Sequence, residues 1–127
     1  MEHVLPVQVY YEDTDHSGVV YHANYLKYFE RAREHLLGVE ELVALWETDR
    51  VGFVVYKASM TFKEGARFGD QVDIRTTVRL ASPYRAVFVQ RAFRGDALLV
   101  DGEIELACVD GDNKLVKLPG IVRERLA

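Results

Sequence analysis

The sequence has few of the features that would crosslink a fold or place it in a membrane. Its single cysteine, Cys108, excludes an internal disulfide and fits a reducing compartment. We interpret Cys108 as a buried packing residue, because no histidine is placed to activate it. No stretch approaches the roughly 18 apolar residues of a membrane-spanning helix, and the first residues lack a basic segment followed by an apolar run. We therefore expect a cytoplasmic protein.

An excess of positive charge is also missing. The chain has 16 Lys and Arg against 20 Asp and Glu, a formal net charge of -4. Because nucleic-acid phosphates are bound by basic surfaces, we expect no nucleic-acid partner. Repeats, low-complexity tracts and linkers are absent too. With 49% hydrophobic and 28% charged residues over 127 positions, the composition predicts one globular domain spanning residues 1–127.

Potentially reactive side chains are concentrated in residues 11–33. Asp13 and Asp15 stand two residues apart, and a helical pattern begins just after His22 and ends at Gly38. The apolar positions of this pattern are Tyr25, Tyr28, Phe29, Ala32 and Leu36. A helix start offers unpaired N–H groups and the positive end of a dipole, which suit an oxygen that gains negative charge.

The loop before this helix partly matches a calcium-binding EF-hand loop, through Asp13, Asp15, Ser17 and Gly18. The last ligand position falls on Asn24, where a bidentate Glu is needed, and the preceding residues alternate as in a strand. We therefore expect no metal. In a purely structural interpretation, the Asp and Ser side chains cap a turn and Gly18 supplies a positive φ. We expect Asp13 to hold the loop through bonds to the backbone.

Taken together, residues 11–33 resemble the opening motif of the 4-hydroxybenzoyl-CoA thioesterase family. The matching segment reads Tyr-x-Asp-Thr-Asp-x-x-Gly-Val-Val-Tyr-His-Ala-Asn-Tyr, followed by Phe-Glu-Arg-Ala-Arg. The similarity continues more loosely through residues 66–70 and 88–91, and it is closest to the bacterial acyl-CoA thioesterase branch associated with the Tol-Pal gene cluster. The resemblance implies the hot-dog fold, an α+β fold in which an antiparallel five-stranded sheet is wrapped around a long central helix.

The resemblance also implies an acyl-CoA thioesterase that needs no cofactor. Asp15 is then the catalytic carboxylate, as nucleophile or as general base to a water, and the His22 backbone N–H polarises the thioester oxygen. Such a preorganised donor stabilises developing charge by a few kcal/mol, and a carboxylate near the carbonyl supplies the second requirement. The family forms dimers or tetramers with active sites between subunits. Peripheral association with a membrane-linked complex stays open.

Other residues of the motif allow two interpretations each. We place Tyr21 with the catalytic residues, and Asn24 and Tyr25 with the substrate-binding residues. Both tyrosines could instead be packing aromatics, and Asn24 could serve only as the N-cap of the helix. The His22 side chain either hydrogen-bonds Asp15 or substrate, or is solvated.

Coenzyme A carries phosphates that basic side chains should meet. In 4-hydroxybenzoyl-CoA thioesterases a basic cluster lies just before the fourth strand, and the matching segment here, residues 83–86, keeps only Arg85. Arginine suits phosphate, so Arg85 is a candidate for binding it. Further candidates are Lys57, Lys63, Arg67 and Arg91, and each of these residues could instead be a solvated surface charge.

The rest of the chain predicts one short helix and a series of strands. The strands are expected at residues 7–11, 54–62, 72–80, 84–93 and 98–109, with a short extension at 114–118; the helix is expected at 39–46, and a helical turn at 121–126. In the second strand, Val54, Tyr56, Ala58, Met60 and Phe62 should share one face. A helix packed on consecutive antiparallel strands is an α+β fold, and its exposed sheet edges favour pairing between chains.

A second function is compatible with the same fold. A non-catalytic acyl-CoA-binding or scaffolding protein could use it, because a fold does not fix a function. The carboxylate at Asp15 in an otherwise intact loop favours the enzyme.

Overall fold

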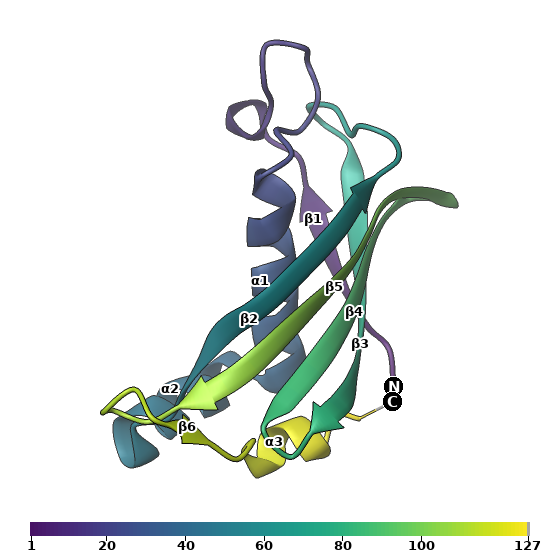
Figure 1. Ribbon diagram of the computed structural model, residues 1–127. Helices are drawn as coiled ribbons and strands as arrows, with labels where there is room; N and C mark the ends of the chain where they lie inside the picture. The colour runs from purple at the N-terminus through teal and green to yellow at the C-terminus, as the bar shows by residue number, and fades with distance from the viewer. Residues whose placement is uncertain (127) are drawn as a thin grey trace.

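A curved antiparallel sheet surrounds one side of the long helix α1 (Figure 1). The computed structural model describes residues 1–126. The strand order is β1-β3-β4-β5-β2, with β6 paired to β5. The strands are β1 (His3–Gln8), β2 (Gly52–Phe62), β3 (Gln71–Ser82), β4 (Arg85–Arg94), β5 (Ala97–Val109) and β6 (Leu115–Val116). The helices are the 3-10 helix η1 (Tyr11–Asp13), α1 (Asn24–Leu37), α2 (Val39–Asp49) and α3 (Gly120–Arg123). The predicted hot-dog fold is confirmed, with β6 as a short sixth strand.

Helix α1 forms where its apolar stripe was predicted. Tyr25, Tyr28, Phe29, Ala32 and Leu36 are all buried. Each large apolar side chain removed from water contributes roughly 1.5–3 kcal/mol, so this stripe fixes the helix against the sheet. The helix ends at Gly38, whose φ of 105° favours glycine and whose N–H donates to the Glu34 carbonyl oxygen at 2.7 Å.

The first strand begins and ends earlier than predicted. β1 covers His3–Gln8 and contains Pro6, which an edge strand tolerates. Just after β1, the Val9 N–H donates to the Asp70 carbonyl oxygen at 2.9 Å, and the Val9 carbonyl oxygen accepts the Gly69 N–H at 3.0 Å. Tyr11, predicted as the last residue of the strand, lies in the exposed 3-10 helix η1 instead.

The face predicted for the second strand is wrong in its first half. A β-bulge at Tyr56 separates the pairs Val55↔Leu106 and Lys57↔Glu105. Because the bulge adds one residue, the alternation of side chains reverses there. The side facing the core therefore carries Phe53 and Val55 before the bulge, then Ala58, Met60 and Phe62. Val54 lies on the opposite side.

One buried arginine links α1 to the centre of the sheet. Arg33 Nη1 donates to Gln90 Oε1 at 3.0 Å, and Gln90 Nε2 donates to the Phe29 carbonyl oxygen at 2.9 Å and to Thr76 Oγ1 at 3.0 Å. Burial lowers the pKa of Arg33, yet a guanidinium stays charged at neutral pH. Gln90 is therefore the buried hydrogen-bond acceptor of Arg33, and the Glu30 and Glu34 carboxylates favour the charged guanidinium.

We expect Gln90→Leu to lower the free energy of unfolding by about 2–3 kcal/mol, because it leaves a buried charged donor without its acceptor. Urea-induced unfolding measures the change. The matched control is Arg91→Gln, the next residue of β4, whose exposed ion pair with Asp101 contributes about 1 kcal/mol or less. Equal losses in the two variants would contradict the role of Gln90.

Candidate active site

The loop before α1 folds tightly around Asp15. The Asp15 N–H donates to the Val19 carbonyl oxygen at 2.8 Å, and the Gly18 N–H donates to the Asp15 carbonyl oxygen at 3.0 Å. Gly18 has the predicted positive φ, 84°. The Ser17 N–H donates to Asp15 Oδ1 at 2.9 Å. Oδ2 accepts no hydrogen bond from residues 1–126, so half of this carboxylate remains available for chemistry.

Asp13 and Asn24 hold the loop in place. Asp13 Oδ2 accepts the Tyr10 N–H at 2.8 Å, and Asn24 Nδ2 donates to the Asp13 carbonyl oxygen at 2.9 Å. The expected structural role of Asp13 is thus confirmed. Asn24 is not an N-cap, because it is the first residue of α1 and the preceding Ala23 occupies the cap position. Burial raises the pKa of Tyr28, and the nearby Asp13 carboxylate adds to the rise.

The start of α1 leaves backbone donors free. The N–H groups of Asn24, Tyr25 and Leu26 donate to carbonyl oxygens of the preceding turn at 2.8, 3.3 and 3.2 Å. The N–H groups of His22 and Ala23 have no acceptor within residues 1–126. Both lie at the positive end of the helix dipole, where an anionic oxygen is stabilised.

One pocket, of about 340 Å³, lies at the end of β2. It is lined by Asp15, His22 and Tyr25 from the reactive loop and α1, and by Phe62 and residues 63–65 from the end of β2 and the turn after it. Figure 1 shows this end of the molecule, where the loop before α1 lies beside the turn between β2 and β3. The structure therefore brings together three of the residues singled out from the sequence.

Tyr21 and Tyr25 occupy different environments. The exposed Tyr21 ring lies against the His22 imidazole, with 4.5 Å between their centroids, and the imidazole lies edge-on to Phe62 at 6.0 Å. Tyr25 is only 2% exposed, and its hydroxyl accepts the Ala66 N–H at 3.4 Å. Burial raises the pKa of Tyr25, so its ring is a neutral wall of the pocket.

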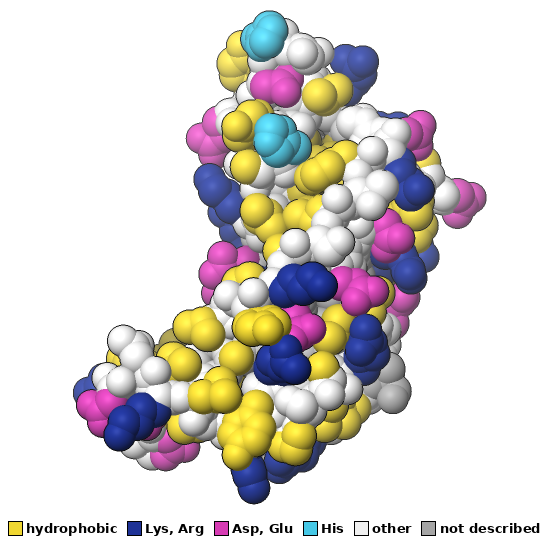
Figure 2. Space-filling model, viewed as in Figure 1, with side chains coloured by type: hydrophobic (Ala, Val, Ile, Leu, Met, Phe, Trp, Pro, Cys, Tyr) yellow, Lys and Arg dark blue, Asp and Glu magenta, His cyan; other side chains and the backbone are white. Residues whose placement is uncertain are grey.

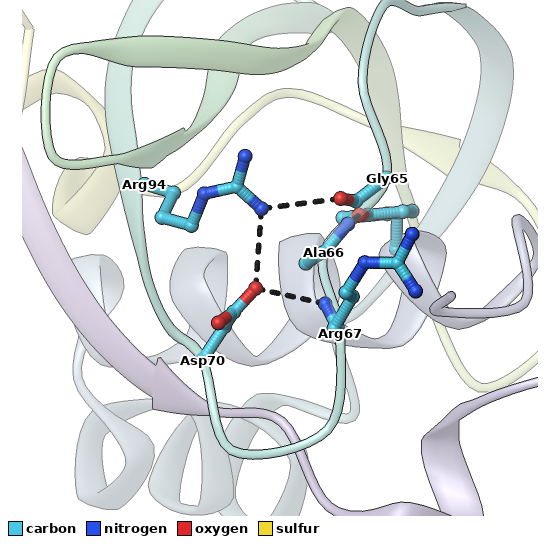
Figure 3. Close-up of polar contacts among 6 residues, drawn as sticks. Gly65, Ala66, Arg67, Asp70 and Arg94 are labelled. Atoms are coloured by element: carbon cyan, nitrogen blue, oxygen red, sulfur yellow. Dashed lines mark hydrogen bonds and ion pairs between the residues drawn. The ribbon is translucent and has the colours of Figure 1, made fainter. Parts of the chain in front are cut away.

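An ion pair that sequence reasoning missed fixes the wall opposite Asp15 (Figure 3). Asp70 Oδ2 accepts the Arg67 N–H at 2.8 Å and an Arg94 Nη1 hydrogen at 3.1 Å, and the same nitrogen donates to the Gly65 carbonyl oxygen at 3.2 Å. The Ala66 carbonyl oxygen accepts the Val20 N–H at 2.8 Å. This arrangement ties the 65–70 turn to the reactive loop. The looser match over residues 66–70 was its only signal in the sequence.

The Arg67 N–H, and then the Arg94 guanidinium, hold the pKa of Asp70 below its usual value of 3.8. A depressed pKa stabilises the folded state above the unfolded-state value, and this contribution disappears as the pH falls through the folded-state value. We expect Asp70→Asn to be less stable than wild type near pH 7, with a difference that shrinks below about pH 4.

Urea-induced unfolding at several pH values measures this difference. Asp96→Asn, in the exposed turn between β4 and β5, serves as the control and should follow wild type at every pH. If the difference in free energy of unfolding between wild type and Asp70→Asn stayed constant down to about pH 3, the charge of Asp70 would not be the cause of the difference.

Arg85 lies outside this pocket. It begins β4, forms an ion pair with Glu105 at 2.9 Å and lies 4.8 Å from the centroid of the Tyr56 ring. Of the other basic candidates, Lys63 lines the pocket and Arg67 lies next to Gly18.

Residues 1–126 contain no cluster of three or more His, Cys, Asp or Glu side chains that could hold a metal ion. Across the same residues, every helix is too short or too polar to cross a membrane.

The fold and this loop define a hot-dog domain of the thioesterase class. Residues 9–126 match the family model of the thioesterase-like superfamily. The chain belongs to this superfamily, and the prediction of a thioesterase enzyme is confirmed.

Two curated relatives and one solved structure illustrate the similarity. The acyl-CoA thioester hydrolase YbgC of Escherichia coli O6:H1 is 40% identical over 111 residues, which cover 83% of this chain and 80% of the relative. The acyl-CoA thioesterase YbgC of Haemophilus influenzae is 38% identical over 122 residues, covering 94% and 90%. The crystal structure of a probable thioesterase from Bartonella henselae superposes with a TM-score of 0.86 at 31% identity, covering 94% of this chain and 100% of that one.

Proposed function

We propose that the protein hydrolyses an acyl-CoA thioester to the free acid and CoA. The observation that carries this proposal is the meeting of Asp15, with one carboxylate oxygen free, and the His22 backbone N–H, without an acceptor in residues 1–126, at one pocket. The activity named for the YbgC relatives supports it.

In the general-base route, Asp15 removes a proton from water as the water oxygen attacks the thioester carbonyl carbon. The carbonyl oxygen gains negative charge and accepts the His22 N–H. When the C–S bond breaks, the CoA sulfur leaves as the thiolate and takes the proton from Asp15. In the nucleophilic route, an Asp15 oxygen attacks the carbonyl carbon, the C–S bond breaks, and CoA leaves as the thiolate, so that a mixed anhydride remains on Asp15. Water then hydrolyses this anhydride, which restores the Asp15 carboxylate and releases the free acid, and the proton lost from water passes to the thiolate. Both routes need the same carboxylate and the same donor.

Roles for the surrounding residues follow from their positions. The His22 side chain lines the pocket, and the Tyr21 ring packs against it and so acts through its position. Tyr25 forms an aromatic wall, and Asn24 acts indirectly by holding Asp13. Lys63 at the pocket is the nearest cation for the CoA phosphates, and Arg85 stays a prediction for the same task. Location in the cytoplasm and association with a membrane-linked complex also stay predictions from the sequence.

We expect Asp15→Asn to lower turnover by roughly 100-fold or more while the protein stays folded, because it removes the base or nucleophile. Free-thiol release from short-chain, long-chain and aromatic acyl-CoAs measures this, with Asp96→Asn as the control. A folded Asp15→Asn protein with wild-type turnover would refute the assignment of Asp15. Wild type that binds acyl-CoA but releases no thiol would instead favour the binding-protein alternative.

We also propose that two chains form a homodimer through the free edge of β2, either alone or as half of a tetramer. This strand pairs only with β5 among residues 1–126, and it leaves Val54, Val55 and Tyr56 between 43% and 62% exposed. An exposed apolar edge strand is a template for pairing with another chain. When the β2 strands of two chains pair in antiparallel orientation, both free edges are buried and the dimer has closed two-fold symmetry.

We expect Tyr56→Asp to convert the dimer to a monomer and to abolish turnover. Tyr56 lies near the middle of β2, so a two-fold pairing places its two copies close together, and two carboxylates there repel one another. Sedimentation measures the association state. Tyr84→Asp, in the turn between β3 and β4, makes the same substitution at an exposed tyrosine outside β2 and should stay dimeric. A dimer that survives Tyr56→Asp would place the interface elsewhere.

A further inference from the structure

The hydroxyl group of Tyr25 is a buried donor whose proton has no acceptor among residues 1–126. Tyr25 is only 2% exposed, and its oxygen accepts the Ala66 N–H at 3.4 Å. The proton of the same hydroxyl is donated to no side chain or carbonyl oxygen of these residues. Because a buried donor without an acceptor is destabilising, such groups are nearly always paired. The acceptor of this proton therefore has to come from outside the described chain.

The Tyr25 side chain lines the pocket that holds Asp15 and His22. In Figure 2, hydrophobic side chains lie at the surface between the loop before α1 and the end of β2, where this pocket opens. Asp15 is not the acceptor, since within residues 1–126 its carboxylate is bound only by the Ser17 N–H. A ligand in this pocket is therefore the natural acceptor for the Tyr25 proton.

The Tyr25 hydroxyl is held by a turn that is itself fixed. The Ala66 N–H occupies one lone pair of the Tyr25 oxygen, so the O–H bond points away from Ala66. The Ala66 carbonyl oxygen accepts the Val20 N–H at 2.8 Å, and the ion pair between Asp70 and Arg94 holds the same turn (Figure 3). The donor is thus oriented before a ligand binds, as stabilisation of developing charge requires.

Tyr25 keeps its proton at neutral pH. Burial raises the pKa of Tyr25 above its usual value of 10.0, although the Ala66 N–H and the Arg94 charge oppose the rise. The Tyr28 ring lies edge-on to the Tyr25 ring, with 5.7 Å between their centroids, and adds to the apolar surroundings. The hydroxyl can therefore donate a hydrogen bond, and it does not act as a base.

The start of α1 brings Tyr25 close to the free His22 N–H. The His22 carbonyl oxygen accepts the Tyr25 N–H at 3.3 Å, so both residues belong to one turn. Side chains of a helix lean toward its N-terminus and cover the preceding turn, which places the Tyr25 ring alongside His22. A carbonyl oxygen has two lone pairs, and one such oxygen in the pocket can accept from both groups.

We propose that the Tyr25 hydroxyl is a catalytic residue, the second hydrogen-bond donor to the thioester oxygen that the His22 N–H also binds. When the carbonyl carbon is attacked, the electron pair of the C=O bond moves onto this oxygen and both hydrogen bonds strengthen. The proton stays on Tyr25, and the electron pair returns when the C–S bond breaks. This inference rests on the proposed function and adds a side-chain donor to its single backbone donor.

Removing the hydroxyl tests this role. We expect Tyr25→Phe to lower kcat by about 100-fold, the loss that follows removal of one such donor, with little change in KM. Tyr84→Phe, at a tyrosine outside the pocket, serves as the control and should follow wild type. Urea-induced unfolding and sedimentation check that both variants stay folded and associated. A folded Tyr25→Phe protein with wild-type kcat would overturn the proposal.

The choice of substrate distinguishes a donor to the thioester oxygen from a donor to the acyl group. Every thioester has the same carbonyl, so Tyr25→Phe should lower kcat by a similar factor for propionyl-CoA, octanoyl-CoA and benzoyl-CoA. The loss should also be equal for butyryl-CoA and 3-hydroxybutyryl-CoA. A loss confined to 3-hydroxybutyryl-CoA would show that Tyr25 binds an oxygen of the acyl group, which contradicts the proposal.

The infrared band of the bound carbonyl provides a readout that does not depend on turnover. Hydrogen-bond donors lower the stretching frequency of a carbonyl. With octanoyl-CoA labelled with ¹³C at the thioester carbonyl and bound to Asp15→Asn, adding Tyr25→Phe should move this band to higher frequency. A purely structural role of Tyr25 in holding Ala66 predicts no such shift, and an unmoved band would overturn the proposal.

The same measurements separate this inference from the proposed function. If Asp15→Asn abolishes thiol release but Tyr25→Phe does not lower it, the enzyme assignment stands and the role of Tyr25 is refuted. If wild type releases no thiol from any acyl-CoA, yet the carbonyl band of bound octanoyl-CoA still shifts with Tyr25→Phe, the proposed function fails. The hydrogen bond from Tyr25 to the thioester oxygen is then supported on its own.

Discussion

The ring of Phe29 lies against the backbone of β5 at Gly102, and this contact sets how closely α1 approaches the sheet. A Cβ atom at Gly102 would stand 3.0 Å from Phe29 Cε2 and 3.2 Å from the Ser59 carbonyl oxygen, so only glycine fits without a shift. The Gln90 side chain binds the Phe29 carbonyl oxygen from the sheet side. Because α1 is held this firmly, its first turn holds a fixed position beside the end of β2, and the free His22 N–H is held with it.

The position of α1 also affects strand β2. Because α1 lies closest to β1 and β3, part of β2 is left without a cover, and apolar side chains remain exposed along a strand with a free edge. A surface of this kind is costly in water and is ordinarily covered by a partner. The pocket of Asp15 and the apolar pocket beside Trp46, which Leu42 and Phe53 also line, occupy the two ends of this strand.

Sequence patterns predicted those elements of the fold that depend on interactions between residues close together in the chain. The stripe from Tyr25 to Leu36, the end of α1 at Gly38 and the turn at Gly18 all depend on residues close together in the chain. The bulge at Tyr56 depends on how β2 registers against β5. An alternating pattern contains no information about that pairing.

Candidate site residues divide in the same way. Asp15 and His22 were identifiable because they are part of one continuous motif, and Tyr25 was identifiable because it begins the apolar stripe. Arg94 was not, since it meets Asp70 only after β3 and β4 have paired. Arg85 was singled out by comparison with a family pattern that this chain keeps in part, and in the fold it binds Glu105. The pocket beside Trp46 is lined by residues of α1, α2, β2 and β5, and no single sequence pattern connects these four elements.

The most direct test is a crystal structure of the Asp15→Asn protein with a non-hydrolysable analogue of octanoyl-CoA, in which a methylene group separates the sulfur from a ketone carbonyl. We expect the analogue's carbonyl oxygen to lie within hydrogen-bond distance of the His22 N–H, with the side chain of residue 15 next to the carbonyl carbon. A carbonyl bound away from His22 and from residue 15 would contradict the proposed active site.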